Sequence, residues 1–76
     1  MGFGYSLITV NEIQNANPNL LGVKLGKVCL KNNIPVKDVA EFFGVTRMTV
    51  YNWFKGKVVV SGKHAERMLK LIDKLK

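Results

Sequence analysis

The sequence predicts an all-α protein, a compact bundle of four to five helices with a partly extended arm at its N-terminus. Residues 36–54 hold two short helical patterns separated by a single glycine. Residues 18–33 and 61–76 each repeat apolar side chains at helical spacing. A chain of 76 residues has room for one domain, and burying only about 60% of its unfolded surface leaves it a modest core.

We predict that residues 1–16 form the arm and residues 17–76 the folded domain. The arm has no basic residue, two early glycines, and a β-branched and aromatic run from Tyr5 to Val10. Disorder, a short strand, and packing against the domain are all compatible with this composition. The residues available for packing are Phe3, Tyr5, Leu7, Ile8 and Val10.

The first predicted helix of the domain begins at Asn17 and Pro18, which suit an N-cap and a first helical position because proline lacks only an N–H that would be unpaired there. It ends near Asn33. Gly22 and Gly26 lower its helix propensity but permit close contact with another helix. Its predicted inner stripe consists of Leu21, Leu25, Val28 and Cys29.

The next helix is short and strongly one-sided. Its apolar residues recur at i, i+3, i+4 and i+7, which places them on one face. Gly44 ends this helix, because the turn needs a residue that tolerates positive φ, and Val45 fills the corner. The apolar face consists of Val36, Val39, Ala40 and Phe43.

A second short helix follows the turn, so that residues 36–54 form a helix-turn-helix. Thr46 is a suitable N-cap, since its hydroxyl can accept from the free N–H groups of the first turn. At helical spacing Val50 and Trp53 face the preceding helix, with Phe54 at the edge of their arc. The residues that point away are Met48, Asn52 and Lys55.

The spacing of five residues carries a family resemblance. An alanine is followed by a glycine four positions later, a valine next to it, a second valine five positions on and a large apolar residue three beyond. This motif core is matched at Ala40, Gly44, Val45, Val50 and Trp53. It is similar to the phage repressor and Cro family of DNA-binding proteins, and the likeness extends over roughly residues 20 to 72.

The resemblance implies that residues 46–54 form a recognition helix that enters the major groove of duplex DNA. The positions that contact bases in this family correspond to Arg47, Met48 and Asn52, suited respectively to guanine, a thymine methyl group and adenine. Thr46 corresponds to a frequent phosphate contact, whereas Tyr51 either bonds phosphate or packs at the rim. The residues expected at the DNA backbone are Thr46, Thr49, Tyr51, Lys55, Lys57, Lys63 and Lys24.

The charge distribution points to the same kind of partner. The chain carries a formal net charge of +7, and every basic residue lies at or after Lys24. From there to the C-terminus twelve basic side chains face four acidic ones, a net charge of +8. A polyanion such as double-stranded DNA is the expected partner.

The last predicted helix begins after Ser61, a suitable N-cap, and follows a run of three valines at residues 58–60. Its apolar arc consists of Ala65, Met68, Leu69, Ile72 and Leu75. Phe42 occupies a motif position that usually faces outward, so either the arm or a second subunit is expected to cover it. Contacts with the arm or in a homodimer are assigned to Phe42, Phe54, Leu71 and Leu75.

Enzymatic function is not expected. The five carboxylates are scattered, and no acid and base can be paired. A single Cys29 excludes an internal disulfide, and with His64 as the one other soft ligand we expect no metal and no other cofactor. We predict that Cys29 is a small apolar residue within a helix and that His64 lies at the surface. There is no membrane-length apolar run and no signal peptide, so a cytoplasmic protein of a bacterium or phage-infected cell is predicted, without a small-molecule substrate.

Three functions are compatible with the sequence. The first is a small transcriptional regulator of repressor or Cro type that binds its operator as a dimer. The second is the site-recognition module of a phage packaging, excision or recombination complex. The third is an adaptor that uses the fold to bind protein, with Phe42, Phe54 and the arm as anchors. Salt-dependent binding to duplex DNA separates the first two functions from the third.

Overall fold

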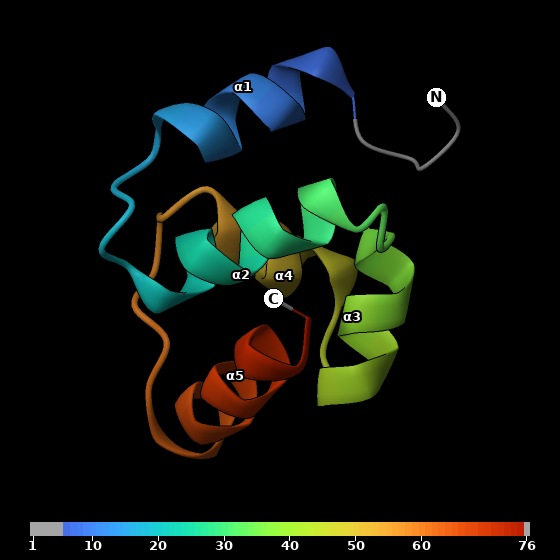
Figure 1. Ribbon diagram of the computed structural model, residues 1–76, viewed down its shortest axis with the longest axis vertical. Coiled ribbons are helices and arrows are strands. Elements are labelled where there is room, and N and C mark those ends of the chain that lie inside the picture. The colour runs from blue at the N-terminus through green and yellow to red at the C-terminus, as the bar shows by residue number, and fades with distance from the viewer. Residues whose placement is uncertain (1–5, 76) are drawn as a thin grey trace.

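The computed structural model describes residues 6–75, and these form five helices and no strand (Figure 1). This confirms the predicted all-α class. Phe3 and Tyr5, two of the residues predicted to be available for packing, lie outside the described residues. The helices are α1 at Leu7–Asn15, α2 at Leu21–Lys31, α3 at Val36–Phe43, α4 at Arg47–Phe54 and α5 at Gly62–Leu75.

Helix α2 lies at the centre of the bundle and contacts α1, α4 and α5 (Figure 1). For this reason it is buried on more than the predicted stripe: Val23, outside that stripe, has no exposed surface. The predicted start at Asn17 and Pro18 was wrong. The side chain of Asn17 accepts from the Asn19 N–H at 2.9 Å, a local turn that competes with helix, and α2 begins only at Leu21.

The expected extended arm was also wrong for residues 7–15, which form α1. Ser6 supplies the N-cap, since its hydroxyl accepts from the Thr9 N–H at 3.1 Å, and this offsets the β-branched residues that favour strand. The helix rests on α2, and its Ile13 is completely buried in the common core. Leu7 and Ile8 remain 74% and 72% exposed, so they do not pack on the domain as expected.

One hydrophobic core joins all five helices. The predicted apolar residues of α3 and α4 belong to it, and Met68 and Ile72 bring α5 into it. Leu69 is a member of the predicted apolar arc of α5 that stays outside the core, because it is 57% exposed. The buried members are Ile13, Leu25, Cys29, Val36, Val39, Ala40, Phe43, Val50, Trp53, Phe54, Met68 and Ile72.

Three aromatic rings hold the start of α5 against the helix-turn-helix. Trp53 meets Phe43 edge to face, with ring centroids 5.4 Å apart and planes at 82°. The ring of His64 lies 5.3 Å from Trp53 and 5.8 Å from Phe43. His64 is therefore a half-buried packing residue rather than the surface residue predicted, and edge-to-face aromatic pairs of this kind add to the stability that burial supplies.

None of the helices within residues 6–75 is both long and apolar enough to cross a lipid bilayer.

Candidate nucleic-acid interface

The turn between α3 and α4 is set by Gly44. This residue adopts φ 69° and ψ 35°, the left-handed conformation that glycine enters without a Cβ clash. The Val45 N–H then donates back to the Ala40 carbonyl at 3.0 Å, and the Gly44 N–H to Glu41 at 3.3 Å, which is the Schellman pattern. The sequence-predicted role of Gly44 as the helix terminator is confirmed.

Thr46 starts α4 in an extended conformation, and its hydroxyl accepts from the Thr49 N–H at 3.3 Å. The two threonine hydroxyls are also 3.0 Å apart. The cap leaves the remaining free N–H groups of the first turn directed out of the N-terminal end of the helix, where the helix dipole favours an anion such as phosphate.

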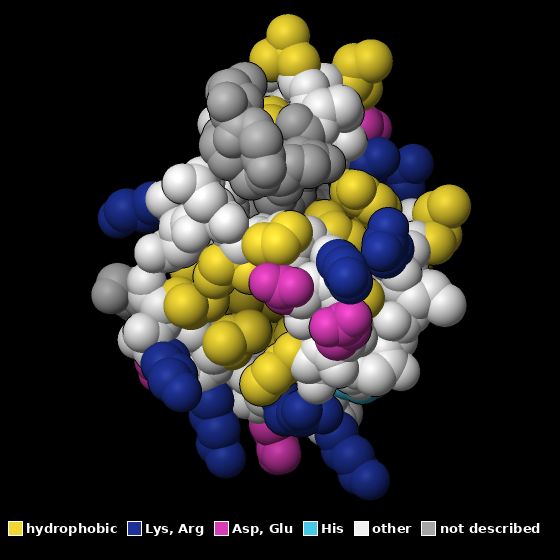
Figure 2. Space-filling view, turned by 90° about the vertical axis from the view of Figure 1, so that its right-hand side faces the viewer, with side chains coloured by type: hydrophobic (Ala, Val, Ile, Leu, Met, Phe, Trp, Pro, Cys, Tyr) yellow, Lys and Arg dark blue, Asp and Glu magenta, His cyan; other side chains and the backbone are white. Residues whose placement is uncertain are grey.

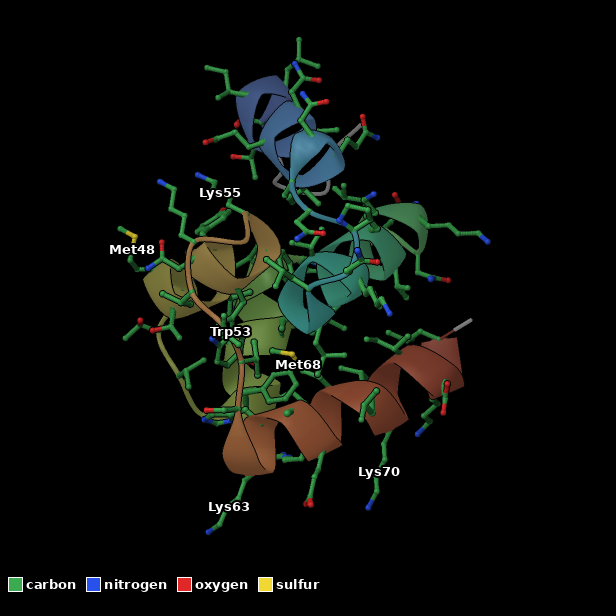
Figure 3. All side chains as sticks on the ribbon, turned by 90° about the vertical axis from the view of Figure 1, so that its left-hand side faces the viewer. Met48, Trp53, Lys55, Lys63, Met68 and Lys70 are labelled. Atoms are coloured by element: carbon green, nitrogen blue, oxygen red, sulfur yellow. The ribbon has the colours of Figure 1, made fainter. Side chains whose placement is uncertain are left out.

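The two sides of α4 differ as the motif predicts. Val50 has no exposed surface and Trp53 is 5% exposed, so both are locked into the core. Arg47 is exposed and Met48 is 68% exposed, whereas Asn52 is half-buried. Figure 3 shows Trp53 directed between the helices and Met48 projecting outward from α4.

The C-terminal end of α4 repeats the turn geometry of α3. Gly56 has φ 75°, and the Lys57 N–H donates to the Asn52 carbonyl at 2.9 Å. A β carbon on Gly56 would lie 3.2 Å from both Leu20 and Val23, so this turn is seated on the start of α2. The backbone of Lys57 is therefore held close to Asn52, and its side chain is exposed to solvent.

Lys55 has a partner that the sequence did not reveal. Its Nζ lies 3.1 Å from Oε1 of Glu12 in α1 and 5.5 Å from the centre of the Tyr51 ring. The carboxylate therefore competes with any phosphate for this ammonium group. A pairing across 43 positions leaves no local pattern, and it depends on α1 being a helix.

The other two predicted backbone cations are placed differently from Lys55 and Lys57. Lys63 is exposed on the first turn of α5 and projects in another direction from Met48 (Figure 3). Lys24 lines a hollow between α2 and α5 together with Leu69 and Asp73. No residue of α4 is among those that line this hollow.

The residues assigned to the arm or to a dimer divide into two groups. Phe54 is completely buried and is not available as an anchor for a partner. A β carbon on Gly26 would meet both Phe54 and Ile13 of α1, at 2.9 Å and 3.2 Å, so Phe54 lies beside the helix that replaces the arm. Phe42, Leu71 and Leu75 instead line one apolar hollow at the surface.

Phe42 is covered in part by a residue that the sequence did not single out. The guanidinium of Arg67 in α5 lies 4.8 Å from the centre of the Phe42 ring and donates to the Phe42 carbonyl at 2.8 Å. This intramolecular contact leaves Phe42 48% exposed. Cover from within the domain was not among the expected alternatives.

Metal-ligating groups and the single thiol are the remaining features of the domain with a possible chemical role. Residues 6–75 contain no cluster of three or more histidine, cysteine or acidic side chains that could hold a metal. Cys29 lies in the core, and burial raises the pKa of its thiol to about 12, which keeps it protonated and unreactive at neutral pH.

A comparison with protein families agrees with this geometry. A family model described as helix-turn-helix matches residues 25–74, which cover α3, α4, nearly all of α5 and most of α2. No curated protein matches the chain. No solved structure matches it either. The family match covers well over half of the sequence and identifies a DNA-binding domain, not an enzyme: the chain belongs to the helix-turn-helix family of repressor and Cro type.

Proposed function

We propose that this protein is a small transcriptional regulator that reads a double-stranded operator with α4 in the major groove. The observation that carries the proposal is the division of α4 into a core side and an outward side. Val50 and Trp53 fix the helix in the domain, which leaves Arg47 and Met48 free at its N-terminal end. Residues at that end of a recognition helix reach base edges in the major groove.

Each outward residue is suited to one type of base contact. Arg47 offers a bidentate pair of donors to guanine, and Asn52 offers a donor and an acceptor to adenine. Met48 supplies an apolar contact for a thymine methyl group. Thr46, Thr49, Tyr51 and Lys57 surround this set on the same segment and are proposed to contact phosphates, which position the helix but carry no sequence information.

A single α4 contacts only a short stretch of DNA, which favours binding of two copies to one operator. A helix of this kind reads a few base pairs, and a pair of half-sites one helical turn apart, about 10 base pairs, extends the sequence that is read. We propose that the protein binds a palindromic operator as a homodimer. Its place of action is then the cytoplasm of a bacterium or of a phage-infected host, where such an operator is located.

Selection of bound sites from random duplexes tests the proposal, with Arg47→Ala and Asn52→Ala as variants. Each should keep the free energy of unfolding within about 0.5 kcal/mol, because neither side chain is in the core. Each should lose about 1–3 kcal/mol of discrimination at the base it contacts. Arg47→Ala should also lower general affinity, since it removes a charge.

The matched control is Lys24→Ala, which removes an exposed charge of α2 and should leave the selected sequence unchanged. A palindromic site with defined spacing in the wild-type selection supports dimeric binding. Identical selection profiles for the wild type, Arg47→Ala and Asn52→Ala would contradict sequence reading by α4. A protein-binding role for the fold would then replace the regulator.

A further inference from the structure

Two adjoining hollows form a groove between α3 and α5. The first has a volume of about 170 Å³ and is lined by Cys29, Ile34, Asp38, Val39, Phe42, Leu71 and Leu75. The second, of about 380 Å³, shares Phe42 and Leu71 with it and adds three cations, Arg67, Lys70 and Lys74. No residue of α4 is among those that line either hollow, so the groove is separate from the proposed DNA-reading surface.

The groove combines an apolar floor with a basic border. Figure 2 shows apolar side chains gathered in a hollowed patch with Lys and Arg side chains along its lower border. Asp38 lines only the first hollow, and the three cations line only the second. Leu71 lies at their junction, where a ligand would meet apolar surface on one side and positive charge on the other.

The basic border is organised by the fold. Arg67 is fixed by its hydrogen bond to the Phe42 carbonyl and its stacking on the Phe42 ring, at 2.8 Å and 4.8 Å. Lys70 and Lys74 are exposed and follow it along α5, four residues apart and so about one turn apart on the same helical face. The spacing matches acidic side chains one turn apart on a second helix.

Charge decides which occupant fits the groove. A second copy in a two-fold interface would double the charges of the groove, so that six cations would meet only the two Asp38 carboxylates among the lining residues. Such an excess of like charge in one interface is unfavourable. A phosphate backbone would satisfy the cations but has no apolar group for the floor. An acidic amphipathic helix supplies both the carboxylates and the apolar side chains.

We propose that this groove is the docking site for an acidic amphipathic helix of a partner protein. Apolar side chains of that helix occupy the hollow beside Phe42 and Leu71, and its carboxylates pair with Lys70 and Lys74. Because α4 does not line the groove, the partner and DNA are bound at the same time. The domain would thereby bring a second protein to the site that α4 reads.

Fluorescence anisotropy with the full chain and a defined probe tests this proposal. The probe is a labelled helical peptide of about 15 residues, with leucines along one face and glutamates one turn apart beside them. Its counterpart carries lysine in place of every glutamate. The acidic peptide should bind at least about tenfold more tightly than the basic one and should weaken as salt is added.

Two variants locate the binding site and two others serve as controls. The double variant Lys70→Glu/Lys74→Glu and the variant Phe42→Ala should each weaken binding of the acidic peptide about tenfold or more. Lys31→Glu is the control for charge, since Lys31 is also exposed but lines neither hollow. Arg47→Ala, which addresses DNA reading, should leave peptide affinity unchanged, so failure of the docking site and failure of DNA recognition are separable.

Several results would overturn the proposal. These are equal affinity for the acidic and basic peptides, no saturable binding of the acidic peptide, and equal losses in Lys31→Glu and in the double variant. A fourth is self-association of the free chain in sedimentation that Phe42→Ala abolishes, because a second copy would then occupy the groove. Circular dichroism of Phe42→Ala establishes that it is folded, and the double variant tests the site through exposed residues alone.

Discussion

Gly22 of α2 lies directly against the backbone of Trp53 in α4. A β carbon on Gly22 would come within 2.5 Å of the Trp53 carbonyl oxygen and 2.9 Å of the Trp53 β carbon. The atoms that the β carbon would meet belong to the backbone and the β carbon of Trp53, not to the end of a flexible side chain. The clash can therefore be relieved only if α2 and α4 move apart. The position of α4 on α2, the central helix of the domain, therefore depends on the absence of a side chain at Gly22.

Gly22→Ala should destabilise the protein by about 2 kcal/mol or more, in the range found for overpacked cores. Alanine is the better helix former by less than that amount, so propensity does not offset the clash. Thermal unfolding followed by circular dichroism should show a midpoint lower by roughly 10 °C for a domain of this size. Lys24→Ala, an exposed site two residues on, is the control. A Gly22→Ala variant as stable as this control would contradict the close approach.

Gly44 should respond to substitution for a different reason. Within the described residues no atom lies within 4 Å of a β carbon built there, so the cost arises from its positive φ alone. Gly44→Ala should lose about 1 kcal/mol, since the left-handed conformation is unfavourable for residues with a β carbon. Gly44→Asn should lose less, because asparagine tolerates this conformation. Urea unfolding of the three proteins measures the order, and equal losses for Ala and Asn would argue against a φ effect.

Cys29 should make stability fall at alkaline pH. Its thiol has a pKa of about 12 in the folded protein, raised by burial from 9.0. The native state therefore retains a proton that the unfolded chain loses, and the stabilising contribution is complete below about pH 9 and is lost as the pH rises toward 12. In Cys29→Ala the free energy of unfolding should fall less steeply over this window, by up to about 1.4 kcal/mol per pH unit.

The comparison with Cys29→Ala isolates the thiol, since every other ionisable group is common to both proteins. A small cavity in the variant lowers its stability by an amount that does not depend on pH. Parallel stability curves between pH 9 and 12 would show that the thiol does not contribute.

Glu12 should restrain DNA binding through Lys55. Glu12→Gln removes the charge that holds Lys55 Nζ at 3.1 Å and leaves the ammonium free for a phosphate. General duplex affinity should rise, and the salt dependence should steepen by up to about one unit. Glu66→Gln is the matched control, an exposed carboxylate on α5. Titrations at several salt concentrations measure both quantities.

A double-mutant cycle assigns the effect to the pair. In a Lys55→Ala background the change Glu12→Gln should alter DNA affinity no more than Glu66→Gln does. If both glutamine variants raise affinity by the same factor in the wild-type background, the effect is one of net charge. The specific competition between Glu12 and phosphate would then be absent.

The helix-turn-helix was predictable because its determinants are local. Gly44 terminates α3 through its own φ, and Thr46 caps α4 through an N–H three residues away. The burial of Ala40, Val50 and Trp53 follows from helical spacing within 14 residues of sequence. Such features need no knowledge of the rest of the chain, and each was confirmed.

Local patterns gave the wrong structure for the segment before the domain. Ile8, Thr9 and Val10 favour strand, but the chain forms α1, because the Ser6 cap and the burial of Ile13 against α2 and Phe54 outweigh that preference. The burial of Ile13 cannot be predicted without knowing where α2 and Phe54 lie. The Glu12 and Lys55 ion pair depends on the same packing.

The sequence by itself determined the class of fold, the turn between α3 and α4, and the outward position of Arg47 and Met48, since these depend on residues within one or two helical turns. Only the tertiary structure decided on which surfaces the basic residues outside α4 lie. Arg67 and Phe42 are 25 positions apart, yet their contact sets one border of the groove. Lys24 in turn lines a hollow together with Leu69 and Asp73 of α5. Packing across such separations depends on how whole helices cross, which no periodic pattern along the chain encodes.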